Sequence, residues 1–381
     1  MAELLRVGMV AGEASSDLLA AHLIAALKAR RPGIEFAGIG GPKMIAEGFE
    51  SHFPMDRLSV RGYSEALRHY REIMGIRRRL VKGMLADRPD LFIGVDSSDF
   101  NLGVERRLRE GGIKAFHFVS PSVWAWRRWR VRRIAKSVDR ILVMFPFEPP
   151  IYEKAGVPVT YVGHPLADMI PFEPPKDEAR AELRLPSRKL IIALLPGSRR
   201  SELEYMASAF VLAAHRFRQE VHDVHFVVPM VTRETREMFE RAIHQHERQD
   251  LPLTLLFGHS HDALAAADLA LVASGTATLE TALFKTPMVI AYRQSSLSWA
   301  IMRQMLYLPY VGMPNILAGE RLVPELLQDE ATPANLAGAL LTLLRDTAAQ
   351  KRQVERFREF HETLRQNTAQ KAADAVLDVL R

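Results

Sequence analysis

Apolar runs with the length of buried strands alternate along the chain with segments in which apolar residues recur at helical spacing. In the first half these runs are Arg6–Ala11, Glu35–Ile39, Leu91–Val95, Ala115–Val119, Arg140–Met144 and Thr160–Val162. In the second half they are Leu190–Leu195, His225–Pro229, Leu253–Phe257, Leu269–Ala273 and Met288–Tyr292. The first helical segment is Ser16–Ala29, and the segments Pro333–Leu344 and Gln350–Leu380 close the chain. Strands separated by helices are typical of parallel sheets with crossover helices, so the pattern predicts an α/β fold.

A stretch rich in proline and charge, residues 166–187, interrupts this pattern and predicts a linker between two Rossmann-like domains. The length of 381 residues also fits two α/β cores better than one. We expect an N-terminal domain over 1–165, a second domain over 188–345 and a helical segment over 346–381 that returns to the first domain. Two open sheets that face each other would bind ligands in a cleft at the carboxyl ends of their strands.

Composition narrows the classes of protein that fit. The chain has no cysteine, which excludes disulfides and thiolate metal sites. Its 51 basic and 45 acidic residues leave a net charge of +6, compatible with an anionic small ligand, an anionic membrane surface or nucleic acid. Basic residues gather in 57–82 and 127–136, where a solvated helix face is the simplest alternative. The N-terminus carries no signal pattern and no apolar run reaches the roughly 18–20 residues of a membrane span, so we expect a cytoplasmic protein.

Two turns in the second half predict a nucleotide site, because each joins a strand to a helix through small residues. In LLPGSR (194–199) a glycine lets a ligand approach the backbone, and the arginine suits a diphosphate. In ASGTATLE (273–280) the final glutamate is placed to accept ribose hydroxyls. An ordinary helix start is the alternative for each turn taken alone. The residues expected to contact a nucleotide diphosphate here are Ser198, Arg199, Ser274, Gly275, Thr276 and Glu280.

Dinucleotide, ATP and metal sites are less well supported. The glycine-rich segment 38–43 lacks the third glycine of the dinucleotide fingerprint, and no phosphate loop of the Lys-Ser/Thr type is present. No Asp-x-Asp pair lies near the nucleotide turns to hold a metal. We therefore expect neither a cofactor nor a metal.

Strand ends in the first half carry candidate catalytic carboxylates. Glu13 follows the first strand in GEASSD, where Ser15 can cap the next helix or face a substrate. Asp96 directly follows a buried strand in GVDSSDFN, where a carboxylate can take the proton of an attacking hydroxyl. Asp96 is our choice of base. The residues alone leave Asp99 open as the base, and helix capping as the role of either aspartate.

The run VSPSVWAW (119–126) supplies further candidates for the substrate side of the first half. Its two tryptophans precede the arginine-rich segment. Tryptophans can stack on sugar rings or lie at a membrane interface, and core packing is the alternative. We expect Ser120, Ser122 and Trp124 to face an acceptor.

The segments quoted so far occur in an order that resembles the lipid-A-disaccharide synthases. The matching segments are GEASSD, GVDSSDFN, VSPSVWAW, FPFE (145–148), VGHP (162–165), LLPGSR, ASGTATLE and Pro314-Asn315. The resemblance spans nearly the whole chain, and VSPSVWAW together with LLPGSR is its most specific part. One difference is Ser16, which stands where that family usually has glycine.

The resemblance implies an inverting glycosyltransferase of the GT-B type that joins UDP-2,3-diacylglucosamine to 2,3-diacylglucosamine 1-phosphate. The product would be the β-1′,6-linked disaccharide 1-phosphate, with UDP released. It further implies Asp96 as general base, Glu13 as the family's glutamate in the first turn, and Asn315 as a contact on the nucleotide side. Another UDP-sugar enzyme of similar shape, such as a UDP-sugar 2-epimerase, is the alternative. A nucleic-acid-binding protein is a weaker one, and we expect no nucleic acid partner.

Acylated substrates also change the interpretation of residues 55–85, where apolar residues lie among arginines. Such a surface can sit on an anionic membrane and take lipid from it. The alternative is a buried helix with an arginine-rich outer face. The resemblance thus implies a protein bound peripherally to the inner face of the inner membrane, and we also expect a dimer. The expected membrane contacts are Leu67, Tyr70, Ile73 and Met74.

Overall fold

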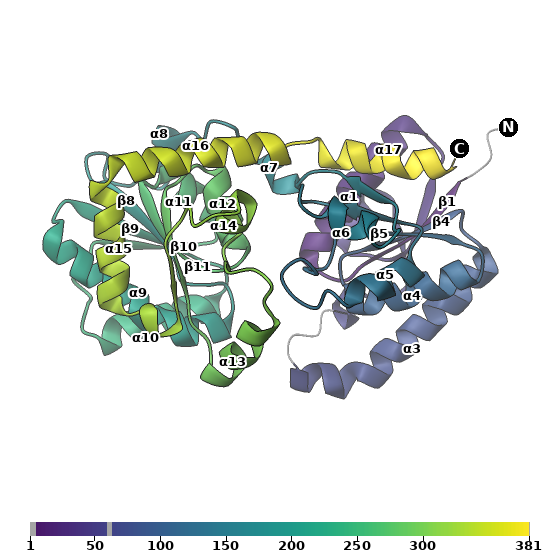
Figure 1. The fold of residues 1–381 in the computed structure, drawn as a ribbon, viewed down its shortest axis with the longest axis horizontal. Helices are drawn as coiled ribbons and strands as arrows, with labels where there is room; N and C mark the ends of the chain where they lie inside the picture. Colours follow the sequence, from purple (N-terminus) through teal and green to yellow (C-terminus); the bar gives the residue numbers. More distant parts are fainter. Residues whose placement is uncertain (1–4, 59–62, 381) are drawn as a thin grey trace. The chain divides into compact units, whose positions relative to one another are not determined.

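The computed structural model describes residues 5–58 and 63–380, and it divides into two compact units. Unit 1 comprises Met1–Asp168 and Leu364–Arg381, and unit 2 comprises Met169–Thr363. Each unit is an open parallel sheet with helices packed on it (Figure 1). The predicted α/β fold of two parallel-sheet domains is therefore confirmed.

Unit 1 is built on a 7-stranded sheet in the order β3-β2-β1-β4-β5-β6-β7, and every recorded strand pair is parallel. Its strands are β1 Arg6–Ala11, β2 Glu35–Ile39, β3 Glu50–Ser51, β4 Leu91–Val95, β5 Lys114–Phe118, β6 Arg140–Val143 and β7 Val159–Tyr161. Its helices are α1 Ala14–Arg30, α2 Pro42–Ala46, α3 Tyr63–Asp87, α4 Ser98–Glu110, α5 Arg130–Ser137, α6 Pro149–Glu153 and α17 Thr368–Leu380, and α7 Pro165–Met169 ends at the boundary between the units.

Alternate residues of the central strands in unit 1 belong to two different cores, because successive strand side chains point to opposite faces of a sheet. Met9 packs into the core that also holds residues of α1 and α17. Its neighbour Val10 packs with Ile76 of α3 and Val104 of α4. Both faces of the sheet are thus covered, as the continuous apolar character of these strands requires.

Unit 2 has a 6-stranded parallel sheet in the order β10-β9-β8-β11-β12-β13. Its strands are β8 Leu190–Leu195, β9 Val224–Met230, β10 Leu253–Phe257, β11 Leu269–Ala273, β12 Met288–Tyr292 and β13 Glu325–Leu327. Its helices are α8 Lys176–Glu182, α9 Arg200–Glu220, α10 Arg233–Gln245, α11 Ser260–Ala266, α12 Thr276–Leu283, α13 Ser296–Met305, α14 Met313–Ala318, α15 Pro333–Arg345 and most of α16 Thr347–Leu364. The short edge strands β3 and β13 were not predicted.

The helical segment predicted over Gln350–Leu380 consists of two helices, because the chain breaks between α16 and α17. Asn367 adopts a left-handed conformation with φ 55, which no helix accommodates. The Asp168 carboxylate accepts from the N–H groups of Asn367 and Thr368 at 2.9 and 2.7 Å, and so caps the new helix. The buried alanines of α17, among them Ala372, join the core of unit 1 beside α1 (Figure 1).

The segment 166–187, predicted as a linker, contains most of α7 and all of α8. The two units divide within it, between Asp168 and Met169. Arg180 of α8 donates to Asp268 in unit 2 at 2.8 Å, which ties the second part of this segment to that unit. Among the described residues, none of the helices has the length and apolar content that a bilayer crossing requires.

Candidate active site

The carboxyl ends of β1 and β4 bring Glu13 and Asp96 to the same edge of the sheet in unit 1. The two strands are adjacent and parallel, with Ala11 paired to Val95, so the residues after each strand leave the sheet together. Asp96 directly follows β4, and its N–H still donates to the carbonyl of Phe118 on β5 at 2.7 Å. Both carboxylates therefore lie at one polar edge of this unit.

The Asp96 side chain is half-buried, and its carboxylate makes no hydrogen bond or ion pair with any residue that the structure describes. Its main chain and that of Ser97 are left-handed, with φ values of 54 and 41. This conformation costs an L-residue roughly 1–2 kcal/mol. Strain of this kind gathers at functional sites, where the surrounding structure holds it in place.

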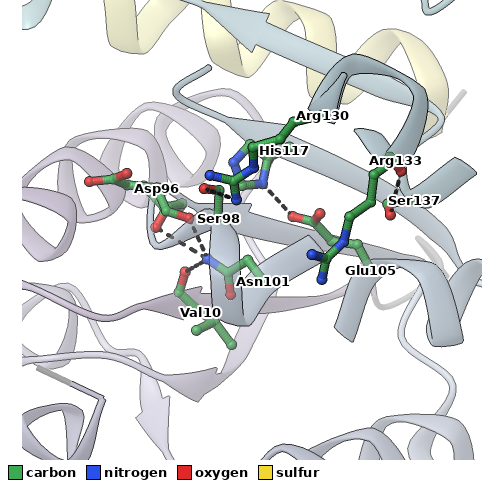
Figure 2. Close-up of polar contacts among 10 residues, drawn as sticks. Val10, Asp96, Ser98, Asn101, Glu105, His117, Arg130, Arg133 and Ser137 are labelled. Atoms are coloured by element: carbon green, nitrogen blue, oxygen red, sulfur yellow. Dashed lines mark hydrogen bonds and ion pairs between the residues drawn. The ribbon is translucent and has the colours of Figure 1, made fainter. Parts of the chain in front are cut away.

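Asp99 has a different environment, which separates the two aspartates that the sequence left open. Its carboxylate lies 2.5 Å from the Nη2 of Arg130, whose side chain is only 9% exposed. The same nitrogen donates to Ser98 Oγ at 3.2 Å (Figure 2). Asp99 lies in the first turn of α4, where a negative charge also suits the helix dipole. The Arg130 ion pair and this helix start account for Asp99, whereas no described residue is paired with the Asp96 carboxylate. The choice of Asp96 over Asp99 as base stays a prediction.

The first turn of α1 presents Glu13 and Ser15 to solvent, and Ser16 lies beneath them. Ser16 Oγ accepts from the Glu13 N–H at 3.0 Å and donates to the Glu13 carbonyl at 2.8 Å. The serine thus closes this turn through its side chain, at the position where the resembling family usually has glycine. Glu13 is consequently held at the start of the helix.

Asp17, the last residue of GEASSD, has a structural role that the sequence analysis missed. It is buried, and its carboxylate accepts from the N–H groups of Gly41, Lys43 and Met44 at 2.8, 3.0 and 3.1 Å. These amides begin α2 in the glycine-rich segment 38–43. Because the protein's own carboxylate occupies them, they are not available to a dinucleotide phosphate.

The VSPSVWAW run leads from β5 into an aromatic cluster at the same edge of the sheet. Trp124 is half-buried, with its ring edge-on to Phe145 and Phe147 at centroid distances of 6.3 and 5.2 Å. Ser120 Oγ lies 2.6 Å from the Tyr152 hydroxyl, whereas the side chain of Ser122 is exposed. Trp124 therefore combines core packing with partial exposure, and Ser122 is the more accessible of the two serines.

Glu148 organises this cluster, although the sequence analysis quoted it only as part of FPFE. It is 1% exposed, and its carboxylate accepts from the N–H groups of Met144 and Phe145 at 3.0 and 2.8 Å. The neighbouring polar groups of Ser120 and Trp124 also favour its ionised form. Burial outweighs these bonds and raises the pKa of Glu148 to about 7. An acidic residue close after a strand end in a run of aromatics was the signal available in the sequence.

The raised pKa of Glu148 predicts a pH dependence of stability. Because the folded-state pKa of about 7 lies above the unfolded value, stability falls as pH rises between about 4.5 and 7. We expect the free energy of unfolding of the wild type, relative to Glu148→Gln, to fall by about 3 kcal/mol over this window. Urea unfolding followed by circular dichroism at several pH values measures it, with the exposed Glu153→Gln as control. The prediction would be contradicted if the difference in unfolding free energy between the wild type and Glu148→Gln stayed constant with pH.

In unit 2, the two nucleotide turns line one cavity of about 280 Å³ at the carboxyl ends of β8 and β11. Six of the seven residues expected to contact the nucleotide belong to its lining, which comprises Leu195, Gly197, Ser198, Arg199, Glu202, Pro229, Val231, Ser260, Ala273, Ser274, Gly275, Thr276, Ala277 and Glu280. The Arg199 side chain is 81% exposed, so its guanidinium is accessible to a ligand. The structure thus brings these six residues together.

Glu202 is a second residue that the sequence analysis missed, and it supports the first nucleotide turn. Its carboxylate accepts from the N–H groups of Ser198 and Arg199 at 2.8 and 3.2 Å. Gly197, with φ 125, leaves room for this contact, because a Cβ there would lie 2.5 Å from Glu202 Cβ. Glu202 lies three residues after Arg199, the residue that caps α9, and a glutamate at this spacing is the sequence signal of such a cap.

Glu280 lies in the cavity wall on α12, where burial raises the pKa of its carboxyl group. His261 Nε2 lies 3.8 Å from Glu280 Oε2 and acts in the opposite direction. It lowers the pKa of Glu280 and so favours the ionised carboxylate. Thr276 begins the same helix, so its exposed side chain and the carboxylate of Glu280 border the same space. A carboxylate at this depth can accept hydrogen bonds from sugar hydroxyls.

Asn315 is absent from the lining of this cavity, and its expected contact with the nucleotide stays a prediction. It is fully buried, and its amide nitrogen donates to the Val323 carbonyl and to the Glu325 carboxylate at 2.9 and 2.8 Å. Its oxygen accepts from the Val323 N–H. Glu325 in turn accepts from the N–H of Val311, whose carbonyl receives a hydrogen bond from Ser274. Asn315 therefore supports the second nucleotide turn through neighbouring residues.

The expected membrane contacts on α3 divide into exposed and packed residues. Tyr70 is 59% exposed. Ile73 is half-buried against the core of unit 1, and Met74 is half-buried beside Arg77. The prediction for Leu67 concerns a side chain outside the described residues. The C-terminal part of α3 follows the alternative reading, that of a buried helix with an arginine-rich outer face.

Within the described ranges, no three His, Asp or Glu side chains group as metal ligands. Metal independence stays a prediction.

Comparison with known proteins yields close relatives over the full length. A family model described as lipid-A-disaccharide synthetase matches residues 7–379. The lipid-A-disaccharide synthase of Dechloromonas aromatica (strain RCB) is 57% identical, with 100% of both chains covered. The lipid-A-disaccharide synthase of Azoarcus sp. (strain BH72) is 56% identical, over 98% of this chain and 96% of the relative.

Solved structures share the fold at low sequence identity. A putative UDP-N-acetylglucosamine 2-epimerase from Listeria monocytogenes superposes with a TM-score of 0.66 and 13% identity, covering 99% of this chain and 95% of the other. At this identity the likeness concerns the fold alone.

Proposed function

The chain belongs to the lipid-A-disaccharide synthetase family and is therefore a UDP-sugar-dependent glycosyltransferase, and from this premise we propose how its residues act. The reaction transfers 2,3-diacylglucosamine from UDP to the 6-hydroxyl of 2,3-diacylglucosamine 1-phosphate. The family match over residues 7–379 supports this activity over the epimerase alternative, whose representative is only 13% identical.

We assign Asp96 as the general base in unit 1. The donor's α-linkage becomes β in the product, so a single in-line displacement suffices. The acceptor oxygen attacks the anomeric carbon and gives its proton to Asp96, while the bond from that carbon to the UDP oxygen breaks. The observation that carries this assignment is the half-buried Asp96 carboxylate without a described partner, beside an Asp99 held by Arg130.

We assign the cavity of unit 2 to the UDP portion of the donor. Arg199 and the N–H groups that begin α12 would stabilise negative charge as UDP departs, and Glu280 would bind the ribose hydroxyls. The exposure of the Arg199 guanidinium and the depth of Glu280 in the wall support these roles. The acceptor would meet unit 1 near Ser122 and Trp124.

The direct test is incubation of the full-length protein with UDP-2,3-diacylglucosamine and 2,3-diacylglucosamine 1-phosphate. We expect mass spectrometry to detect the tetraacyl disaccharide 1-phosphate together with one UDP per product. Conversion of the donor to an epimer, without any disaccharide, would overturn the proposal.

We further propose that unit 1 binds peripherally to the inner face of the inner membrane through α3. Tyr70 is exposed there, and Arg71, Arg78 and Arg79 on the same helix are exposed cations. An aromatic ring beside several cations suits an anionic lipid surface, which would also supply the acylated substrates. Dimerisation stays a prediction.

Replacement of Tyr70 by glutamate is expected to weaken membrane binding about tenfold, because it removes an interfacial ring and adds a repelled charge. Co-sedimentation with vesicles of phosphatidylethanolamine and phosphatidylglycerol measures the effect. Tyr205→Glu, at a tyrosine on α9 that is 39% exposed, is the matched control in unit 2. Equal binding by Tyr70→Glu and the wild type would refute the assignment of α3.

A further inference from the structure

The main chain at Asp96 needs an external support, because two successive residues there are left-handed without being glycine. Asp96 has φ 54 and Ser97 has φ 41. This backbone sets the direction in which the Asp96 side chain leaves the strand end. Whatever holds these two residues therefore also determines where the proposed proton acceptor lies.

Asn101 provides a direct support. It lies on α4 one turn after Ser97, is fully buried, and its amide nitrogen donates to the Asp96 carbonyl at 2.8 Å. The same nitrogen lies 3.4 Å from the Val10 carbonyl (Figure 2). It also lies 3.3 Å from the Val95 carbonyl. One side chain thus joins the carboxyl ends of β1 and β4 at the point where the strained residues begin.

A second buried pair lies one helical turn further along α4. Glu105 and His117 are both fully buried, and Glu105 Oε1 lies 2.6 Å from His117 Nδ1 (Figure 2). The pair links α4 to β5, and Gly94 on β4 makes room for it. A Cβ on Gly94 would overlap Glu105 Oε1 and lie 2.8 Å from Asn101 Cβ. The three strands β1, β4 and β5 are therefore tied to α4 by one polar column.

This column is a costly way to pack a helix on a sheet. Asn101 Oδ1, Glu105 Oε2 and His117 Nε2 are buried without a hydrogen-bond partner in the described chain. An apolar contact of the same size would satisfy the packing without leaving polar atoms unpaired. Directional hydrogen bonds fix the orientation and register of the helix on the strands as well as their distance. A general base requires such a fixed orientation toward its substrate.

We propose that Asn101, backed by the Glu105–His117 pair, is a positioning residue that holds Asp96 in the orientation needed to take the acceptor's proton. This inference rests on the proposed role of Asp96. A residue that acts only through Asp96 has a distinctive property: its removal should matter only while the Asp96 carboxylate is present.

The test is a double-mutant cycle in kcat with Asn101→Ala and Asp96→Asn, measured on the full-length protein by mass spectrometry of the disaccharide. We expect Asn101→Ala to lower kcat about 10- to 100-fold in the wild type, with KM for both substrates changed less than about threefold. In the Asp96→Asn background the same substitution should change kcat less than about twofold. Equal losses in both backgrounds would overturn the proposal.

Glu105→Gln keeps the size of the side chain and serves if Asn101→Ala does not fold. We expect it to lower kcat about 3- to 10-fold in the wild type and to have no further effect in Asp96→Asn. Leu108→Ala is the control, because it opens a cavity in the apolar core beneath the same helix and removes no hydrogen-bonding group of the column. A kcat loss in Leu108→Ala equal to that in Asn101→Ala would reduce the column to a packing role and overturn the proposal.

The two proposals fail in distinguishable ways. If the wild type forms no disaccharide, or if Asp96→Asn retains full activity, the proposed function or the assignment of the base is wrong. The remaining case is an active wild type and an inactive Asp96→Asn variant. If Asn101→Ala then lowers kcat equally in the Asp96→Asn background, only the positioning role of Asn101 is wrong.

Discussion

Replacement of Asp96 by asparagine is expected to lower kcat about 10²- to 10⁴-fold, the usual contribution of a positioned general base. Asparagine keeps the size of the side chain but cannot accept the proton of the acceptor hydroxyl. Substrate binding should change little, because the Asp96 carboxylate makes no hydrogen bond or ion pair with a described residue. Steady-state kinetics with both lipid substrates measures the effect, and KM for the donor should stay within about threefold of the wild type.

Asp99→Asn is the matched control for this prediction, since it lies three residues away and its carboxylate is paired with Arg130. We expect its kcat to stay within about threefold of the wild type, with a small loss of stability from the weakened ion pair. If Asp99→Asn instead loses as much activity as Asp96→Asn, the distinction between the two aspartates fails.

Replacement of Arg199 by alanine is expected to lower kcat/KM for the UDP-sugar donor about 10²- to 10³-fold. The guanidinium is 81% exposed in the cavity wall, so it is available to the departing diphosphate, and loss of one such charge-stabilising donor has this magnitude. Stability should be nearly unchanged, because the contact of Arg199 with Glu202 is an exposed one at 3.7 Å. Kinetics at varied donor concentration, together with UDP binding by calorimetry, measures both parts.

Arg200→Ala tests whether the effect is specific to the position. Arg200 is the next residue along the chain and is paired with Glu204 and Glu234 on the surface. It does not line the cavity. We expect donor kinetics within about twofold of the wild type. A similar loss of kcat/KM in both variants would mean that net positive charge, rather than the guanidinium of Arg199, determines donor binding.

The nucleotide turns were predictable because each is a local feature. A strand end, a glycine and a helix start lie within six residues of one another in LLPGSR, and parallel strands place such turns at one edge of a sheet. The supports of these turns were less visible. Glu202 could have been found from its spacing, whereas the role of Asn315 depends on residues that the sequence does not mark.

The alternating pattern of apolar strands and helices determined the α/β fold and most strand positions, because strand and helix periods are properties of a few consecutive residues. It also determined that acidic side chains follow buried strands. The pattern did not mark the break between α16 and α17, where Asn367 is left-handed and its N–H donates to the Asp168 carboxylate in a long-range contact.

The tertiary structure alone decided which partners each of these side chains has. Asp96 and Asp99 read alike in the sequence, and an arginine 31 residues away separates them. Glu148, Glu105 and Asn101 acquire their roles from partners on other strands and helices. The physical reason is that hydrogen bonding, burial and charge pairing depend on neighbours in space, and only the folded chain brings those neighbours together.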